Sequence, residues 1–398
     1  MFNNVKKLLL GNGLAQAIQF GSIVFLSRIY YPADFALLTQ AQSIATILAV
    51  IATLQMHLSI PLTKGVDEAR NTARIVESLS FFLFLVTFPI AIYFGKIYIF
   101  AFVLTLAVAV SNTCNSYLVF SGDFGRLSGF YIKRALLIVG VQFGCAALSV
   151  QDGLLWGAVI GEAATALYLR KATFGFSKIH LGLRAIWETT LRLRSFSFYG
   201  TTQELTSVAA FYAPLILFTS TLGADIGGQY AMVNRLVWGP TILLTSSIAQ
   251  VLYHQFGKVP PRRGDSHSLS YLFLDRKIFL AAILGCLIAF QLEDLYLFVL
   301  GGQWGLASKM LPWGMTWGAV FLMSIPFRVA CRVLHLQKYQ LFVDGVTLSS
   351  IWLMFTFSGF TPIGMMQGLV GIAFMQNALL ALAVWLSIRY KAPDMAGA

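Results

Sequence analysis

Residues 97–120 read IYIFAFVLTLAVAVSNTCNSYLVF, a run without a single charged side chain. At 1.5 Å per helical residue, a run of this length crosses the roughly 30 Å hydrocarbon core of a bilayer. Because lipid offers no partner to backbone N–H and C=O groups, only a helical bundle or a closed barrel can span it. The run lacks the alternation of a barrel strand, so it predicts a transmembrane helix.

Similar apolar runs recur along the whole chain. Apolar residues make up 58% of the 398 positions and charged residues 11%, whereas a soluble domain has about 45–50% and about 25%. We predict an all-α integral membrane protein with about 12 transmembrane helices. The predicted spans are 8–29, 35–58, 75–95, 97–120, 130–150 and 154–169, then 198–222, 227–252, 278–297, 310–329, 341–360 and 363–388.

The distribution of Lys and Arg predicts the orientation. Of the 28 cationic residues, 24 fall on one side of the predicted spans. Another 3 fall on the opposite side (Arg28, Lys96 and Lys309), and the remaining one, Arg235, falls inside a span. The positive-inside rule then places both termini in the cytoplasm. We therefore attribute the net charge of +12 to topology and to contact with anionic membrane lipids, and we expect no nucleic-acid partner.

A polar stretch divides the predicted spans into two sets of six. We predict an N-terminal lobe over 1–170, a cytoplasmic amphipathic linker over 171–197 and a C-terminal lobe over 198–398. Ala33-Asp34 and Ala224-Asp225 follow the first and seventh spans, which favours a parallel repeat of the kind found in secondary transporters.

Within the linker, apolar residues are spaced so that they share one helical face: Leu183, Ile186, Trp187 and Leu191. This spacing favours a helix lying in the membrane interface, and a plain solvated linker is the alternative.

Markers of enzyme chemistry are missing from the sequence. It contains no Walker A loop, no H-E-x-x-H, no G-x-S-x-G and no Asp-x-Asp pair, and no outer loop is long enough for a catalytic domain. The cysteines Cys114, Cys145, Cys286 and Cys331 lack metal-site spacing. We therefore expect no catalytic residues, no metal site and no cofactor, with coupling to protons or sodium left open.

A few ionisable residues fall at membrane depth, where their cost usually reserves them for an interior cavity. They are Arg28, Glu162, Glu204 and Arg235. Each also has a structural interpretation. Arg28 could snorkel to the outer interface, Glu204 could lie at an entrance, and Arg235 could form an internal ion pair. Glu162 lies in the small-residue run 157–164, so it is either a buried packing residue or, together with Glu204, a candidate for ion coupling.

Three short motifs carry a family resemblance. Ser27-Arg28-Ile29-Tyr30-Tyr31-Pro32-Ala33-Asp34-Phe35 joins the first two spans, residues 228–235 (GQYAMVNR) with Pro240 occupy the eighth, and residues 302–307 (GQWGLA) precede the tenth. They resemble the motifs of polysaccharide and O-antigen flippases in the multidrug/oligosaccharidyl-lipid/polysaccharide exporter superfamily. One departure is Ala36, where that family usually has glycine after Asp-Phe.

The resemblance implies two six-helix lobes around a central cavity that opens alternately to each side of a bacterial inner membrane. The implied substrate is an isoprenoid-pyrophosphate-linked oligosaccharide, an O-antigen or exopolysaccharide repeat unit, and polysaccharide polymerase machinery is a candidate partner. The implied pyrophosphate needs cations, which makes Arg28 and Arg235 the candidate substrate-binding residues. The motif residues expected to be structural are Pro32, Asp34, Tyr230, Pro240 and Trp304.

Two other functions stay open. A multidrug or organic-cation antiporter of the same fold should place acids in its cavity. A membrane-embedded polysaccharide polymerase or ligase, which belongs to a different class of protein, should have a large outer loop with catalytic residues.

Overall fold

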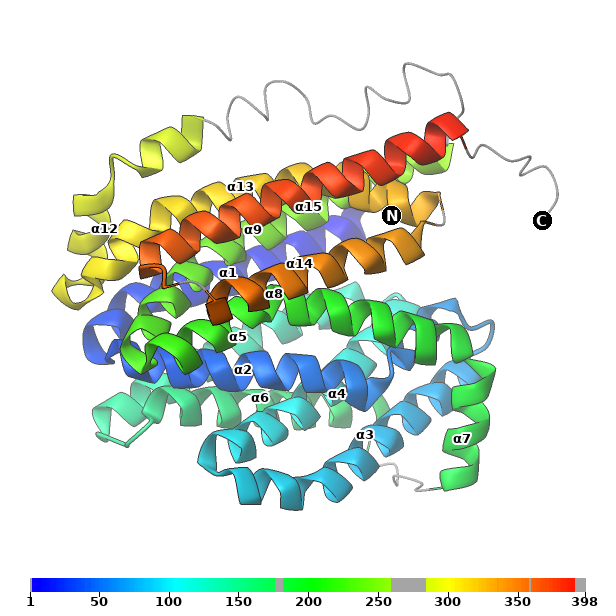
Figure 1. Ribbon diagram of the computed structural model, residues 1–398. Helices are drawn as coiled ribbons and strands as arrows, with labels where there is room; N and C mark the ends of the chain where they lie inside the picture. Colours follow the sequence, from blue (N-terminus) through cyan, green and yellow to red (C-terminus); the bar gives the residue numbers. More distant parts are fainter. Residues whose placement is uncertain (1, 176–181, 259–283, 335, 358, 391–398) are drawn as a thin grey trace. The chain divides into compact units, whose positions relative to one another are not determined.

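The computed structural model describes residues 2–175, 182–258, 284–334, 336–357 and 359–390, and these form helices and turns without a strand (Figure 1). The first part contains α1 (Phe2–Ile29), α2 (Pro32–Thr53), η1 (Met56–Leu62), α3 (Val66–Phe94), α4 (Lys96–Ser121), α5 (Phe124–Ala147), α6 (Gly153–Phe174), α7 (Leu183–Arg192), η2 (Ser195–Gly200) and α8 (Thr201–Leu222). The rest contains α9 (Ala224–Lys258), α12 (Glu293–Leu300), η3 (Gly302–Trp304), α13 (Gly305–Val333), α14 (Gln337–Phe357) and α15 (Pro362–Tyr390).

The predicted fold class, an all-α membrane protein, is confirmed. Among the described residues, 8 helical segments are long and apolar enough to cross a membrane. Helices α1 to α6 overlap the first six predicted spans in order, and α8, α9, α13, α14 and α15 overlap five of the second six.

The second predicted span, 35–58, is too long. Helix α2 ends at Thr53, because Leu54 (φ 43°) and Gln55 (φ 52°) adopt the left-handed conformation that turns the chain. The 3-10 helix η1 follows and contains Pro61, whose missing N–H and ring prevent an α-helix from continuing through it.

The ninth predicted span, 278–297, lies partly outside the described residues. Its described part is interrupted at Phe290 and Gln291, where the Gln291 N–H donates to the carbonyl of Ile288 at 2.9 Å. Helix α12 then begins with Glu293 and Asp294 in its first turn, where the positive end of the helix dipole favours acidic side chains.

Packing divides the chain into two compact units, 1–219 and 220–398. In the first unit, α5 packs against α1 and α6, while α4 packs against α2, α3 and α6. In the second, α13 packs against α9 and α15, and α14 packs against α15. The pairs α2/α4, α4/α6 and α5/α6 thus recur in chain order as α9/α13, α13/α15 and α14/α15, as a parallel repeat requires. The first unit includes α8 as far as Thr219. The lobe boundaries, which were predicted by counting spans, stay a prediction.

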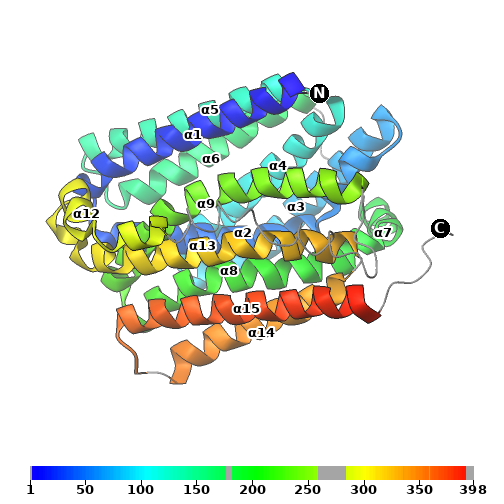
Figure 2. The same ribbon diagram turned by 90° about the horizontal axis from the view of Figure 1, so that it is seen from above.

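The expected linker helix forms as α7. Figures 1 and 2 show it running across the ends of the long helices of its own unit, beside the start of α3. Ile186 is buried against Met56, Val76 and Leu79, whereas Trp187 is 61% exposed. The side of α7 that carries Ile186 therefore packs on the first unit. Trp187 is exposed on this helix, and its contact with the membrane interface stays a prediction.

Candidate functional site

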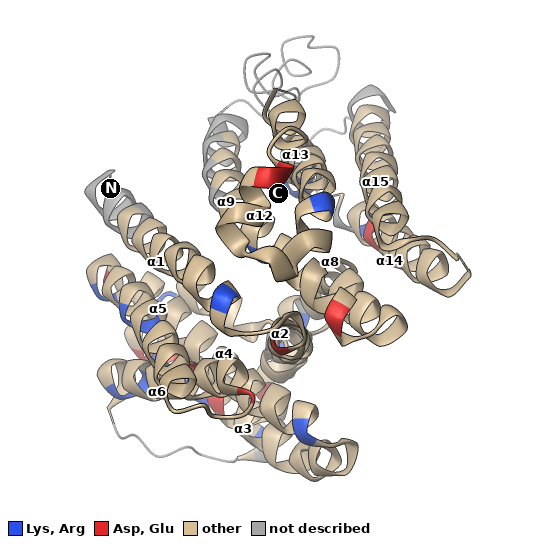
Figure 3. Cartoon of the chain, turned by 90° about the vertical axis from the view of Figure 1, so that its left-hand side faces the viewer, with Lys and Arg blue, Asp and Glu red and all other residues tan. Residues whose placement is uncertain are grey.

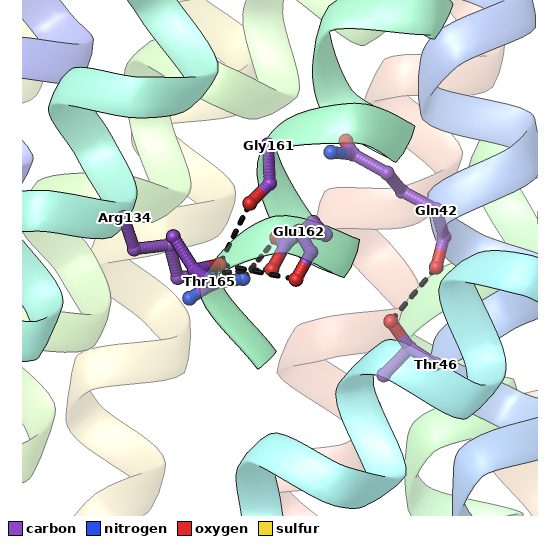
Figure 4. Close-up of polar contacts among 6 residues, drawn as sticks. All are labelled: Gln42, Thr46, Arg134, Gly161, Glu162 and Thr165. Atoms are coloured by element: carbon purple, nitrogen blue, oxygen red, sulfur yellow. Dashed lines mark hydrogen bonds and ion pairs between the residues drawn. The ribbon is translucent and has the colours of Figure 1, made fainter. Parts of the chain in front are cut away.

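Glu162, one of the predicted ion-coupling residues, lies in the middle of α6 and is 4% exposed. Its carboxylate contacts Arg134 of α5 through two hydrogen bonds: Nε donates to Oε2 at 2.7 Å, and Nη2 donates to Oε1 (Figure 4). The Arg134 side chain is 35% exposed and the Glu162 side chain 5%. A bidentate pair of this kind is the strongest form of charge-assisted hydrogen bonding.

Small residues allow α5 and α6 to approach closely at this pair. A Cβ on Gly157 would lie 2.4 Å from Gln142 Cγ, and a Cβ on Gly161 would lie 2.5 Å from Ile138 Cγ1. The tight helix contact predicted from the small-residue run 157–164 is therefore confirmed. Because Gly161 precedes Glu162, the close approach brings the carboxylate within reach of Arg134.

Helix α2 also packs against α6. In Figure 4 its Gln42 and Thr46 are drawn beside the pair, and the Thr46 hydroxyl donates to the Gln42 carbonyl at 2.8 Å. On α6, the Thr165 hydroxyl donates to the Gly161 carbonyl at 2.7 Å. Polar groups thus occur on three helices of the first unit, α2, α5 and α6, at membrane depth.

A second charged network lies in the second unit. Asp344 of α14 is 1% exposed, and its Oδ1 accepts hydrogen bonds from Arg328 Nη2 of α13 at 3.3 Å and from Gln376 Nε2 of α15 at 3.0 Å. Asp344 was not among the site residues predicted from the sequence. It lies inside predicted span 341–360, so the cost of an acid at membrane depth, which singled out Glu162, would have found it as well.

A third buried pair joins α3 to α6. Arg170 Nε donates to Glu77 Oε2 at 3.3 Å, and Glu77 is 3% exposed. Glu77 lies inside predicted span 75–95, and it too was not among the predicted site residues. The buried carboxylates of the described residues, Glu77, Glu162 and Asp344, therefore each contact a guanidinium.

The other predicted site residues lie on helices α1, α8 and α9. Arg28 is exposed in the last turn of α1, and Glu204 is partly exposed in the first turn of α8. Arg235 is partly exposed in α9. Arg28 belongs to the first unit and Arg235 to the second, so their shared role in binding an anion stays a prediction. Figure 3, in which the backbone is coloured at Lys, Arg, Asp and Glu, shows that charged residues are sparse along the helices.

The motif residues lie at a helix start, in buried positions and within α9, and their structural role stays a prediction. Pro32 starts α2, and the Asp34 carboxylate accepts the Tyr31 N–H at 2.9 Å, which satisfies a free donor at the helix start. Tyr230 and Trp304 are 1% and 0% exposed. Pro240 lies within α9.

Gln229 joins the motif of the eighth span to the one before the tenth. Its Nε2 donates to the Gln303 carbonyl at 2.7 Å, and its Oε1 accepts the Ala307 N–H at 2.8 Å. The amide side chain thereby holds the GQWGLA turn against α9.

The described residues contain no group of three or more His, Cys, Asp or Glu side chains placed to hold a metal ion.

No protein-family model matches the chain. A curated relative is the succinoglycan biosynthesis transport protein ExoT of Rhizobium meliloti (strain 1021), which is 24% identical over 319 residues. That match covers 74% of this chain and 61% of ExoT, so this chain spans less than two thirds of its relative.

Solved structures with the same fold include two kinds of membrane transporter. The lipid II flippase MurJ in an inward closed conformation superimposes with a TM-score of 0.71 at 12% identity, covering 97% of this chain and 88% of MurJ. A multidrug resistance transporter of the MATE family, of the MOP superfamily, in an outward-facing conformation gives a TM-score of 0.61 at 14% identity, covering 97% and 95%.

Proposed function

We infer that this chain, a member of the multidrug/oligosaccharidyl-lipid/polysaccharide exporter superfamily, moves an isoprenoid-pyrophosphate-linked oligosaccharide across a bacterial inner membrane by alternating access. The superfamily was expected from motifs 27–35, 228–240 and 302–307, and the likeness to MurJ and to the MATE transporter agrees with that expectation. The observation that carries the substrate class is the relative ExoT, a transport protein of succinoglycan biosynthesis. An exopolysaccharide repeat unit is therefore our first choice of cargo.

The MATE fold supports a second candidate, an antiporter for organic cations. A cationic drug would need a carboxylate free to receive it. Glu77, Glu162 and Asp344 each contact an arginine, so these acids are already neutralised by the chain itself. This internal pairing favours an anionic substrate over a cationic one.

The proposal makes Arg28 and Arg235 the cations that pair with the pyrophosphate. A charge-assisted hydrogen bond contributes roughly 1.5–3 kcal/mol, so Arg28→Ala or Arg235→Ala should weaken substrate binding about tenfold to a hundredfold. Changing both should stop transport. Arg235→Lys should restore little, because a Lys ammonium cannot reproduce the planar fork of arginine.

The test measures flipping of a lipid-linked oligosaccharide in proteoliposomes for each variant after confirming membrane insertion. Lys309→Ala is the matched control, because Lys309 is an exposed cation at the start of α13 that the proposal leaves unused. If Arg235→Ala inserts normally and flips at the wild-type rate, Arg235 does not bind substrate.

The rival from another class, a polysaccharide polymerase or ligase, predicts a covalent product. Wild-type protein in proteoliposomes should change the sidedness of the lipid-linked oligosaccharide and leave its length unchanged. Chain extension in this assay would favour the enzyme. The proposed orientation, with both termini in the cytoplasm, and the association with polymerase machinery belong to this same proposal.

A further inference from the structure

An apolar groove of about 420 Å³ lies between α14 and α15 of the second unit. Its walls include Tyr339 and Phe342 from α14 and Leu379, Leu382, Ala383 and Leu386 from α15. Phe342 is 67% exposed and Leu382 is 49% exposed, so the groove opens at the surface of this unit. The groove's lining is almost wholly apolar, so it suits a hydrocarbon chain.

The groove lies at one end of the two helices. Its α14 residues belong to the first turns of that helix and its α15 residues to the last turns. Lys338 is exposed and stands in the chain between two lining residues, Leu336 and Tyr339. Arg332, at the end of α13, is also exposed. The positive-inside rule places this end in the cytoplasm.

We propose that this groove holds the isoprenoid tail of the substrate in the cytoplasmic leaflet while Lys338 and Arg332 contact its phosphate. The inference rests on the proposed function. The groove and its cations fit both parts of an amphipathic ligand, because the apolar walls contact the tail and the cations at the groove's end contact the anionic head. Such a groove would keep the tail in contact with the protein while the sugar head is moved.

The probe is undecaprenyl phosphate, and its binding to the purified full chain is measured by native mass spectrometry against phosphatidylglycerol as competitor. Ala383→Trp fills the groove and should weaken binding about tenfold or more, because the tail loses its apolar contacts. Ala378→Trp is the matched control, since Ala378 is an exposed residue of α15 that does not line the groove, and it should bind as the wild type does.

Two further variants keep the test decisive if Ala383→Trp does not fold. Leu382→Asn keeps the branched shape and the number of non-hydrogen side-chain atoms but places an amide in the groove, and it should weaken binding as well. Lys338→Ala should weaken binding of undecaprenyl phosphate and leave binding of the uncharged alcohol undecaprenol unchanged. Equal competition by phosphatidylglycerol would show that the groove binds ordinary lipid and would overturn the proposal. Wild-type binding by Ala383→Trp or Leu382→Asn would overturn it too.

The flipping assay separates this inference from the function on which it rests. If the wild type binds undecaprenyl phosphate in the groove but flips no lipid-linked oligosaccharide, the proposed function fails and the tail site stands. If the wild type flips and Ala383→Trp both binds and flips normally, the tail site fails and the proposed function stands.

Discussion

At the scale of single residues, the two partners of the α5–α6 ion pair differ in exposure. Arg134→Met leaves Glu162 as a carboxylate that is 5% exposed, whereas Glu162→Gln leaves Arg134 with a side chain that is 35% exposed. Removing one partner of a buried ion pair lowers the free energy of unfolding by about 3–5 kcal/mol when the remaining charge stays buried. We therefore expect Arg134→Met to lower the unfolding temperature in detergent more than Glu162→Gln does.

The double variant Arg134→Met/Glu162→Gln serves as the control for this comparison. It removes both charges and should be more stable than Arg134→Met alone. An unfolding temperature for Arg134→Met equal to that of Glu162→Gln would contradict the exposures of the two side chains.

Glu162 is also predicted to take part in ion-driven transport. If it exchanges an ion during the cycle, Glu162→Gln should abolish ion-driven transport while the protein still inserts into the membrane. The measurement is flipping as a function of pH in proteoliposomes. A normal pH dependence in Glu162→Gln would leave the pair with Arg134 as a packing contact only.

His57 gives a prediction about stability and pH. It lies in η1, outside the spans, is 7% exposed, and its burial lowers the pKa from 6.5 to about 4. Between these values the unfolded chain binds the proton and the folded chain does not. The free energy of unfolding is therefore highest above pH 6.5 and falls as the pH decreases below it. The loss reaches at most about 3 kcal/mol near pH 4.

The measurement is thermal unfolding in detergent from pH 7.5 down to pH 4.5. His57→Gln removes the titrating group, and its unfolding temperature should depend less on pH than that of the wild type. Parallel pH profiles for the two proteins would show that His57 is protonated without cost in the folded state.

At the scale of helices, the contact between α5 and α6 depends on glycine. Gly157→Ala would place a methyl group 2.4 Å from a side-chain atom and 2.8 Å from the backbone nitrogen of Gln142. We expect this change to destabilise the first unit by about 1–3 kcal/mol, the usual cost of overpacking. A drop in unfolding temperature in detergent would measure it.

Gly144→Ala, on α5, is the matched control. A Cβ at Gly144 meets no atom within 4 Å, and alanine is the better helix former, so this variant should be as stable as the wild type or slightly more stable. Equal losses for Gly157→Ala and Gly144→Ala would mean that α5 and α6 do not pack as closely as described.

The helices also show what the sequence could predict. The span 97–120 differs from α4 by one residue at each end, because its apolar run is bounded by Lys96 and Gly122. The end of α2 was missed because apolar residues continue to Leu58, although the backbone turns at Leu54 and Gln55. Glu162 was predicted as a site residue because an ionisable side chain is costly in lipid. Its partner Arg134 was counted among the cytoplasmic cations and was not predicted. A pairing between helices depends on their rotation and depth, which spacing within one helix does not specify.

At the scale of the whole molecule, topology can be tested by fusion. A reporter that is active only outside the cytoplasm should be active when fused after Asp152 or Asp225, each at the start of a helix, and silent after Lys391 or Arg263, which lie outside the described residues. Activity after Arg263 would contradict the twelve-span arrangement.

The contact of Asp344 with Arg328 also has a consequence for biosynthesis. An aspartate near the centre of an inserting helix costs about 2.5–3.5 kcal/mol, so α14 alone should partition poorly from the translocon into lipid. Arg328 is synthesised first, on α13, and Asp344 follows on α14. We expect the two helices to leave the translocon together as a hairpin, so that the nascent chain never exposes the acid to lipid without its cation.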